Sequence, residues 1–211
     1  MLEEKNFSPA TIERLPVYYR ALQKLEDKKI TEVSSIELSK MLGFKPEKIR
    51  KDLTEFGNFG IKGLGFKVSE LKNKISNILG LQNNFRLAII GVGKLGTALA
   101  NYEKISDLGF VVAALFDTDK EHIGEEINGV RVYDFDKFIS ISHRKLIDIG
   151  VITVPDSEAQ KVADVLAEAE VHGIWNFTSV KLKVPYFVTV VNEDLTVGLG
   201  TLSFYLNQNW N

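Results

Sequence analysis

The sequence predicts an α/β protein in two parts, a small domain of short helices and a hairpin followed by a domain built on a parallel sheet. Residues 1–83 carry 15 Lys and Arg against 11 Asp and Glu, whereas residues 84–211 carry 11 against 17. From residue 86 onward, continuous apolar runs replace amphipathic helical patterns, and such runs indicate strands buried on both faces. A basic part therefore precedes an acidic part, and only the basic part is suited to a polyanion.

The composition is that of an ordinary globular chain, with 45% hydrophobic residues among 211. The sequence has no cysteine, which excludes disulfides, thiolate nucleophiles and Cys-ligated zinc, so we expect no metal site. The first residues are acidic and polar, and no apolar run reaches membrane-spanning length. We therefore expect a cytoplasmic protein that does not contact a membrane.

The first helix is predicted to begin after Ser8, because a hydroxyl N-cap followed by Pro9 is a typical helix start. Pro16 predicts a kink within it. Its apolar residues recur at helical spacing. These residues are Ile12, Leu15, Tyr19, Leu22 and Leu25.

Two short helices joined by a glycine turn predict a helix-turn-helix. Ser34 and Glu37 fit a capping box at the start of the first, and Gly43 ends it. The second begins at Pro46 and ends at Gly57, with a buried stripe at Ile49, Leu53 and Phe56. The outward residues, which are placed to face DNA, are Lys48, Arg50, Lys51 and Thr54.

A glycine-rich stretch at 56–68 alternates glycine with apolar and basic residues, which predicts a β-hairpin wing. Ser69 is then expected to cap a fourth helix that ends at Gly80. The polar stretch 82–84 predicts a linker. We therefore expect a winged-helix domain over 1–82, a Rossmann-type domain over 83–193 and a terminal helical segment over 194–211.

Five apolar runs predict the strands of the second domain: 87–90, 111–116, 149–154, 174–177 and 188–191. The stretch 194–207 then predicts a terminal helix with an exposed apolar face. That face consists of Leu195, Leu199, Leu202 and Leu206.

A glycine loop between the first of these strands and a helix predicts a dinucleotide site. It matches GxGxxG, where the glycines allow a tight turn, close approach of a pyrophosphate and close packing of helix on strand. Asp117 follows the next strand, where a carboxylate accepts hydrogen bonds from a ribose diol and repels a 2′-phosphate, so NAD(H) is favoured over NADP(H). The loop residues are Gly91, Val92, Gly93, Lys94, Leu95 and Gly96.

Two further turns follow later strands, and ligands bind at the carboxyl ends of parallel strands. They are candidates for the nicotinamide side of the site, although both also fit ordinary strand-to-helix turns. Their residues are Thr153, Val154, Pro155, Asn176, Phe177 and Thr178.

The space beside the cofactor has no predicted catalytic residue. A dehydrogenase needs an acid or base and a substrate pocket there, yet only about twenty residues follow the last strand, and His122, His143 and His172 fit structural positions. A bound cofactor without a substrate can still report its state through differential affinity for two conformations. We therefore favour a sensor, with a small NAD-dependent oxidoreductase or a CoA-binding regulator as the alternatives.

The chain resembles the Rex family of bacterial redox-sensing transcriptional repressors over nearly its whole length. The segments that carry the resemblance are Arg14 to Arg20, Ile49 to Leu53, the wing at 56–65, the loop at 91–96 and Leu199 to Phe204. The resemblance implies a homodimer that exchanges its terminal helices and binds palindromic operator DNA. It also implies that NADH releases the DNA and that NAD⁺ competes weakly.

The resemblance also implies roles for individual residues. Arg50 and Lys51 are expected in the major groove, and Lys62 at the wing tip is expected in the minor groove. Arg20 and Asp194 match a switching ion pair, and Tyr102 matches a residue that changes partners near the nicotinamide. Leu195 departs from the pattern, because a member of the family has an aromatic residue there near the nicotinamide.

Overall fold

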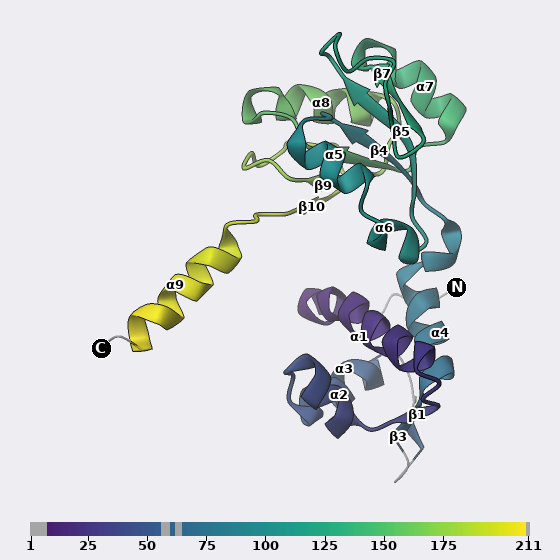
Figure 1. Cartoon of the computed structure of the whole chain (residues 1–211), viewed down its shortest axis with the longest axis vertical. Coiled ribbons are helices and arrows are strands. Elements are labelled where there is room, and N and C mark those ends of the chain that lie inside the picture. Colours follow the sequence, from purple (N-terminus) through teal and green to yellow (C-terminus); the bar gives the residue numbers. More distant parts are fainter. Residues whose placement is uncertain (1–7, 56–59, 62–64, 210–211) are drawn as a thin grey trace. The chain divides into compact units, whose positions relative to one another are not determined.

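The computed structural model describes residues 8–55, 60–61 and 65–209. The chain forms two compact units, Met1–Asn83 and Asn84–Asn211 (Figure 1). The N-terminal unit has one hydrophobic core, and the C-terminal unit has a core on each face of its sheet. Within the described residues, no helix has both the length and the apolar character needed to span a bilayer.

The N-terminal unit is a winged helix, as predicted. Its helices are α1 (Pro9–Asp27), α2 (Ser35–Leu42), α3 (Pro46–Glu55) and α4 (Val68–Leu79), and a short 3₁₀ turn, η1 (Leu81–Asn83), follows them. An antiparallel sheet has the order β1-β3-β2, formed by β1 (Glu32–Val33), β3 (Gly65–Lys67) and β2 (Gly60–Ile61). The pairing of β2 with β3 confirms the hairpin. Strand β1 was not predicted, because two residues are too few to show an alternating pattern.

The structure confirms the predicted start of α1 and both predicted ends of α2. The Ser8 hydroxyl accepts a hydrogen bond from the backbone N–H of Thr11 at 3.2 Å. In the capping box, the Ser34 hydroxyl accepts from the Glu37 N–H at 3.1 Å, and the Glu37 carboxylate accepts from the Ser34 N–H at 2.7 Å. Gly43 ends α2 in the left-handed conformation, with φ +75°, which favours glycine.

Three expectations about this unit are corrected. The fourth helix begins at Val68 after Lys67, not after Ser69, and Lys67 and Glu70 pair at 2.9 Å across its first turn. In α1, which continues past Pro16, Ile12 is exposed rather than in the core. Tyr18 rather than Tyr19 is the fully buried tyrosine of α1, because its hydroxyl finds a buried acceptor. Phe56 and Gly57 lie outside the described residues.

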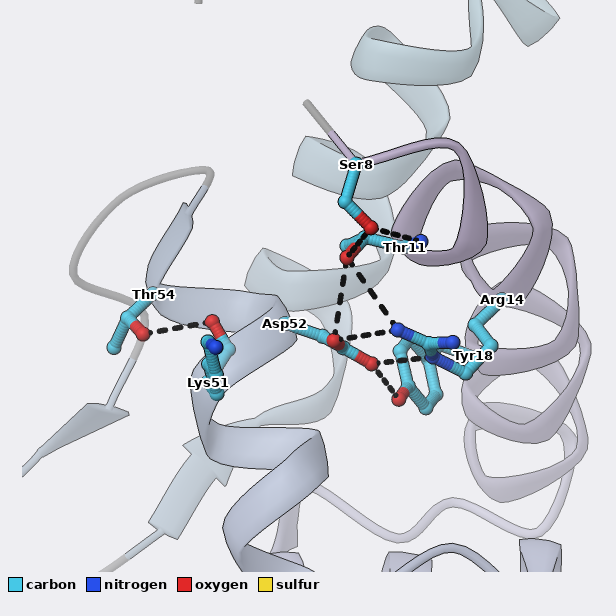
Figure 2. Close-up of polar contacts among 7 residues, drawn as sticks. All are labelled: Ser8, Thr11, Arg14, Tyr18, Lys51, Asp52 and Thr54. Atoms are coloured by element: carbon cyan, nitrogen blue, oxygen red, sulfur yellow. Dashed lines mark hydrogen bonds and ion pairs between the residues drawn. The ribbon is translucent and has the colours of Figure 1, made fainter. Parts of the chain in front are cut away.

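That buried acceptor is the carboxylate of Asp52 on α3 (Figure 2). Arg14 binds it with two nitrogens, Nε to Oδ2 at 2.6 Å and Nη2 to Oδ1 at 2.8 Å. The Tyr18 hydroxyl donates to Oδ2 at 2.6 Å, and the Thr11 hydroxyl donates to Oδ1 at 3.4 Å. Every one of these donors belongs to α1, so the cluster ties α3 to α1.

The cluster also fixes which face of α3 is exposed. Asp52 is buried beside Ile49 and Leu53, so the inner face of α3 contains an ion pair as well as apolar residues. Lys48, Arg50 and Lys51 are therefore turned outward, as predicted. Burial raises the pKa of Asp52, but the hydrogen bonds from Arg14 and Tyr18 outweigh it, and the pKa lies below its usual value.

The C-terminal unit is a Rossmann-type fold, as predicted, with the sheet order β10-β9-β8-β4-β5-β7-β6. Counted along the chain, its six parallel strands lie in the order 3-2-1-4-5-6, and the order reverses between β4 and β8. Only β6 is antiparallel to its neighbour β7. The strands are β4 (Arg86–Ile90), β5 (Val111–Asp117), β6 (Glu126–Ile127), β7 (Val130–Asp134), β8 (Ile149–Ile152), β9 (Gly173–Asn176) and β10 (Thr189–Asn192).

Helices cover both faces of this sheet. Alternate residues of β4 enter different cores: Ala88 and Ile90 pack with α7 and α8, whereas Leu87 and Ile89 pack with α5 and α6. The prediction missed β6 and β7, which are short and contain charged residues, and it extended β8 two residues too far. The helices are α5 (Lys94–Ala100), α6 (Lys104–Asp107), α7 (Phe138–Lys145) and α8 (Asp156–Glu168), with a 3₁₀ turn η2 (Phe135–Lys137) before α7.

The terminal helix α9 (Val197–Asn209) is confirmed (Figure 1). Its apolar side chains are exposed. Apolar residues surround it rather than forming one stripe, because aromatic residues lie between the predicted leucines. The exposed set is Leu195, Val197, Leu199, Leu202, Phe204, Tyr205 and Leu206.

We predict that Asp52→Asn destabilises the N-terminal unit by about 2–4 kcal/mol, because it leaves the partly buried Arg14 guanidinium, whose side chain is 15% exposed, without its counter-ion. Hydrogen exchange of α1 and α3 amides in the full chain measures the effect. Asp27→Asn at the exposed end of α1 is the matched control. It should change the free energy of unfolding obtained from exchange by less than about 0.5 kcal/mol. Equal protection in both variants would contradict the role assigned to the cluster.

The same cluster predicts a pH dependence. The folded-state pKa of Asp52 is lowered, so its contribution is fully present above the unfolded-state pKa and is lost as the pH falls through the folded-state value. Acidification should therefore lower the protection factors of the α1 and α3 amides, which are corrected for the intrinsic exchange rate at each pH, more in the wild type than in Asp52→Asn.

Candidate functional site

The glycine loop joins β4 to α5 at the point where the strand order reverses. Gly91 has φ +94°, a conformation that side chains disfavour, and its N–H donates to the Phe116 carbonyl of the next strand at 2.8 Å. A Cβ on Gly96 would lie 1.9 Å from the Gly91 carbonyl oxygen, so only glycine lets α5 pack this closely. A Cβ on Gly93 would meet nothing within 4 Å.

Thr153, which follows β8, supports the loop from the other side of the reversal. Its hydroxyl lies 2.8 Å from the Gly91 carbonyl oxygen and 3.0 Å from that of Ile90. A Cβ on Gly91 would come within 2.9 Å of the Thr153 carbonyl. Thr153 therefore holds the loop through its side chain, a contact that the sequence prediction did not include.

Asp117 lies at the end of β5 and binds the loop directly. Its Oδ2 accepts from the Val92 N–H at 2.8 Å, and its Oδ1 accepts from the N–H groups of Thr118 and Asp119 at 2.7 and 2.9 Å. His122 Nδ1 lies 3.3 Å from Oδ2. Burial raises the pKa of Asp117, but these hydrogen bonds outweigh it, so the pKa is below its usual value. An ionised carboxylate therefore lies beside the glycine loop.

The turn after β9 is organised by Asn176, whose side chain is fully buried. Its Nδ2 donates to the Val180 carbonyl and to Asn192 Oδ1 at 3.0 and 2.9 Å, and its Oδ1 accepts from the Thr178 hydroxyl at 2.8 Å. We therefore assign Asn176 to building the turn that carries Phe177. Asp156, which starts α8, accepts hydrogen bonds from the backbone and hydroxyl of Ser179, so it joins this turn to the one after β8.

The structure thus brings the glycine loop, Asp117 and the turns after β8 and β9 to the carboxyl ends of β4, β5, β8 and β9, the edge where such sheets bind nucleotides. Tyr102 is not among them, because it follows the far end of α5, where the Ala100 carbonyl accepts from Asn128 just before β7. Lys94 and Pro155 are exposed at the nucleotide-binding edge, whereas Val92 and Thr178 are buried. Tyr102, just after α5, has an exposed fraction of 52%. Leu95, Val154 and Phe177 are partly buried.

The N-terminal unit presents the predicted basic residues on α3. Lys48, Arg50 and Lys51 are exposed, and Arg50 bonds to Ser35 and Glu47. Lys62 lies outside the described residues. Arg20 is exposed on α1, and Asp194 is exposed before α9, where its carboxylate accepts from the Thr196 N–H and hydroxyl.

Some functional features were missed from the sequence. Asp52 was not recognised as a buried ion-pair residue, although a carboxylate three residues after Ile49 and next to Leu53, within the predicted buried stripe, is a usable signal. His122 beside Asp117 was read as a residue of a polar loop. Among the described residues, no group of three or more His, Asp or Glu side chains is arranged to hold a metal ion.

Comparisons with known proteins identify both units. A family model described as a putative DNA-binding protein N-terminus matches residues 6–54, and one described as a CoA binding domain matches residues 82–180. A redox-sensing transcriptional repressor Rex of Clostridium botulinum is 46% identical over 99% of both chains. The repressor of the same name in Clostridium tetani is 43% identical, again over 99% of both chains.

Solved structures agree with these relatives. The chain is similar to RSP in complex with β-NAD⁺ and operator DNA, with a TM-score of 0.89, 39% identity and coverage of 98% of this chain and 95% of that one. It is equally similar to RSP in complex with β-NADH, with a TM-score of 0.88, 38% identity and coverage of 98% and 97%. The curated relatives are named as transcriptional repressors rather than as enzymes. The chain belongs to the Rex family of redox-sensing transcriptional repressors.

Proposed function

We propose that this protein is a cytoplasmic NADH-responsive repressor, which binds operator DNA as a homodimer and releases it when NADH binds. One observation carries the proposal: a glycine loop backed by an ionised Asp117 belongs to the same chain as a helix-turn-helix with an exposed basic face. RSP, its structural neighbour, was solved with β-NADH and with β-NAD⁺ plus operator DNA.

The residues present fit a dinucleotide. The open space above Gly93 leaves room for a pyrophosphate at the start of α5, and the first N–H groups of a helix have no acceptor within it. Asp117 is placed to accept from an adenosine ribose, and its negative charge disfavours a 2′-phosphate. When bound, the cofactor supplies a nicotinamide ring that is cationic when oxidised and uncharged when reduced.

That difference in charge is the basis for sensing. We propose that the turns after β8 and β9, with Thr153, Val154 and Phe177, line a desolvated pocket on the nicotinamide side. Burying a cation in such a pocket costs free energy that burying a neutral ring does not. The reduced form therefore selects the closed conformation of the protein, and the oxidised form does so more weakly.

The route from cofactor to DNA is part of the proposal. The exposed apolar side chains of α9 suit exchange of this helix between two subunits, since a two-fold swap buries the same face twice. We assign switching roles to Arg20, Tyr102 and Asp194, whose side chains are exposed. Closure would then turn the two α3 helices away from successive major grooves, with Lys62 in the wing losing its minor-groove contact.

The match of residues 82–180 to a CoA binding domain supports a second candidate ligand. CoA also contains an adenine nucleotide and a pyrophosphate, which the same loop can hold. It lacks the nicotinamide ring, so it would not report redox state. Calorimetric titration with NADH, NAD⁺, NADPH and CoA under one set of conditions separates the candidates.

The proposal predicts that NADH displaces the protein from DNA more effectively than NAD⁺ does. Fluorescence anisotropy of labelled operator-like DNA at fixed salt measures this, since salt alone changes nucleic-acid affinity strongly. We expect NADH to weaken binding at least tenfold and NAD⁺ to change it by less than about threefold, in line with typical coupling free energies. Turnover of NADH with a hydride acceptor, without an effect on DNA binding, would instead support an oxidoreductase.

Two glycine substitutions separate folding from binding. Gly96→Ala places a methyl group 1.9 Å from a backbone oxygen and should destabilise the C-terminal unit by about 1–3 kcal/mol or more. Gly93→Ala meets no atom within 4 Å, so stability should change by less than about 1 kcal/mol. It should nevertheless weaken NADH binding at least tenfold, because its methyl group fills the proposed pyrophosphate space. Unchanged NADH affinity in a folded Gly93→Ala protein would contradict the placement.

A further inference from the structure

Arg50 on the outer face of α3 is held by two neighbours from the helix-turn-helix. Its Nη1 donates to the Ser35 hydroxyl at 2.8 Å, and its Nη2 donates to Glu47 Oε1 at 3.1 Å. Its side chain is still 51% exposed. Among the described contacts, the neighbouring Lys48 and Lys51 have no hydrogen bond from their ammonium groups. Arg50 is thus the one outward basic residue of α3 whose orientation is fixed within the described domain.

The two neighbours differ in how firmly they are fixed. Glu47 is 73% exposed and lies one turn from Arg50 on the same helix, a type of pair that contributes little by itself. Ser35 is 8% exposed and is the first residue of α2, directly after the capping-box residue Ser34. Ser35 therefore belongs to a different helix from Arg50 and is buried there. Of the two partners of Arg50, Ser35 is the more firmly fixed in position.

Both contacts leave donors available to DNA. A guanidinium has five N–H groups, two on each terminal nitrogen and one on Nε. Ser35 accepts an N–H group of Nη1, and Glu47 accepts an N–H group of Nη2. Each of these two nitrogens therefore has one further N–H group. Guanine O6 and N7 accept two parallel donors in the major groove, and the Nε–H of Arg50, which has no described partner, can form such a pair with a remaining terminal N–H. Holding the side chain in advance also lowers the entropy lost on binding.

We propose that Ser35 is a positioning residue of the DNA interface, whose hydroxyl orients the Arg50 guanidinium to recognise one base pair in each operator half-site. Lys48 and Lys51 lack such an anchor and suit phosphate contacts, which do not depend on sequence. This inference rests on the proposed function, since it assumes that α3 enters the major groove. It adds a residue outside the exposed basic face, on α2, to the determinants of specificity.

The test uses the full-length protein and operators in which each half-site base pair is replaced in turn, with anisotropy competition at fixed salt. Arg50→Ala should lose discrimination at one position by about 5- to 100-fold, the range for one bidentate contact. Ser35→Ala should lose about 3- to 10-fold at that same position. In the Arg50→Ala background, adding Ser35→Ala should change nothing further.

Three controls keep the result decisive. Ser39→Ala removes a hydroxyl from the same helix without touching Arg50 and should behave as the wild type. Ser35→Thr keeps an acceptor and should restore discrimination, which a purely structural loss would not allow. The dependence of affinity on salt should be the same for Ser35→Ala and the wild type, because the number of phosphate contacts is unchanged.

The inference is overturned if Ser35→Ala keeps wild-type discrimination, or if it weakens binding equally with and without Arg50. The wild type in the same samples tests the proposed function separately. If the wild type fails to bind the operator or to be released by NADH, the proposed function fails. If the wild type behaves as expected and Ser35→Ala matches Ser39→Ala, only the assignment of Ser35 fails.

Discussion

A buried carboxylate needs donors, and Asp52 receives its described side-chain donors from α1 alone: the Arg14 guanidinium and the hydroxyls of Tyr18 and Thr11. Leaving such a charge without partners costs several kcal/mol, so α3 is held against α1 in one rotation about its own axis. That rotation places Arg50 and Lys51 outward. The face that we assign to DNA is therefore a consequence of an ion pair on the opposite face of the same helix.

The C-terminal unit uses a partly buried carboxylate in a related way. Asp117 accepts backbone N–H groups from its own turn and from Val92 in the glycine loop, so it joins the ends of β5 and β4. Thr153 closes the loop from β8, and Gly96 allows α5 to approach within contact of Gly91. These contacts within the protein hold the turn in one conformation, which reduces the ordering that binding requires.

The sequence predicted well those features that depend on local geometry. Capping residues, left-handed glycines and continuous apolar strands have their effect within a few residues, so Ser34, Gly43 and the runs of β4 and β5 were predictable.

Pairings between residues far apart in the sequence were not predictable. The contact of Arg14 with Asp52 spans 38 residues, and no periodicity reports it. Arg14, Tyr18 and Asp52 lie in two of the segments that carry the family resemblance, and the structure shows that they form one cluster. Short strands such as β1 and β6 were missed because their pairing comes from neighbours rather than from their own residues.

We propose that the cofactor acts as a signal, through a free-energy coupling between the nucleotide loop and the helix-turn-helix. Coupling between two binding equilibria is reciprocal, so DNA must weaken NADH binding by the same factor by which NADH weakens DNA binding. The direct measurement is the affinity for NADH, by calorimetry, in the absence and in the presence of saturating operator DNA at one salt concentration. We expect NADH to bind more weakly in the presence of the operator, by the same factor by which NADH weakens DNA binding in the anisotropy titration. Equal NADH affinity under both conditions would contradict it.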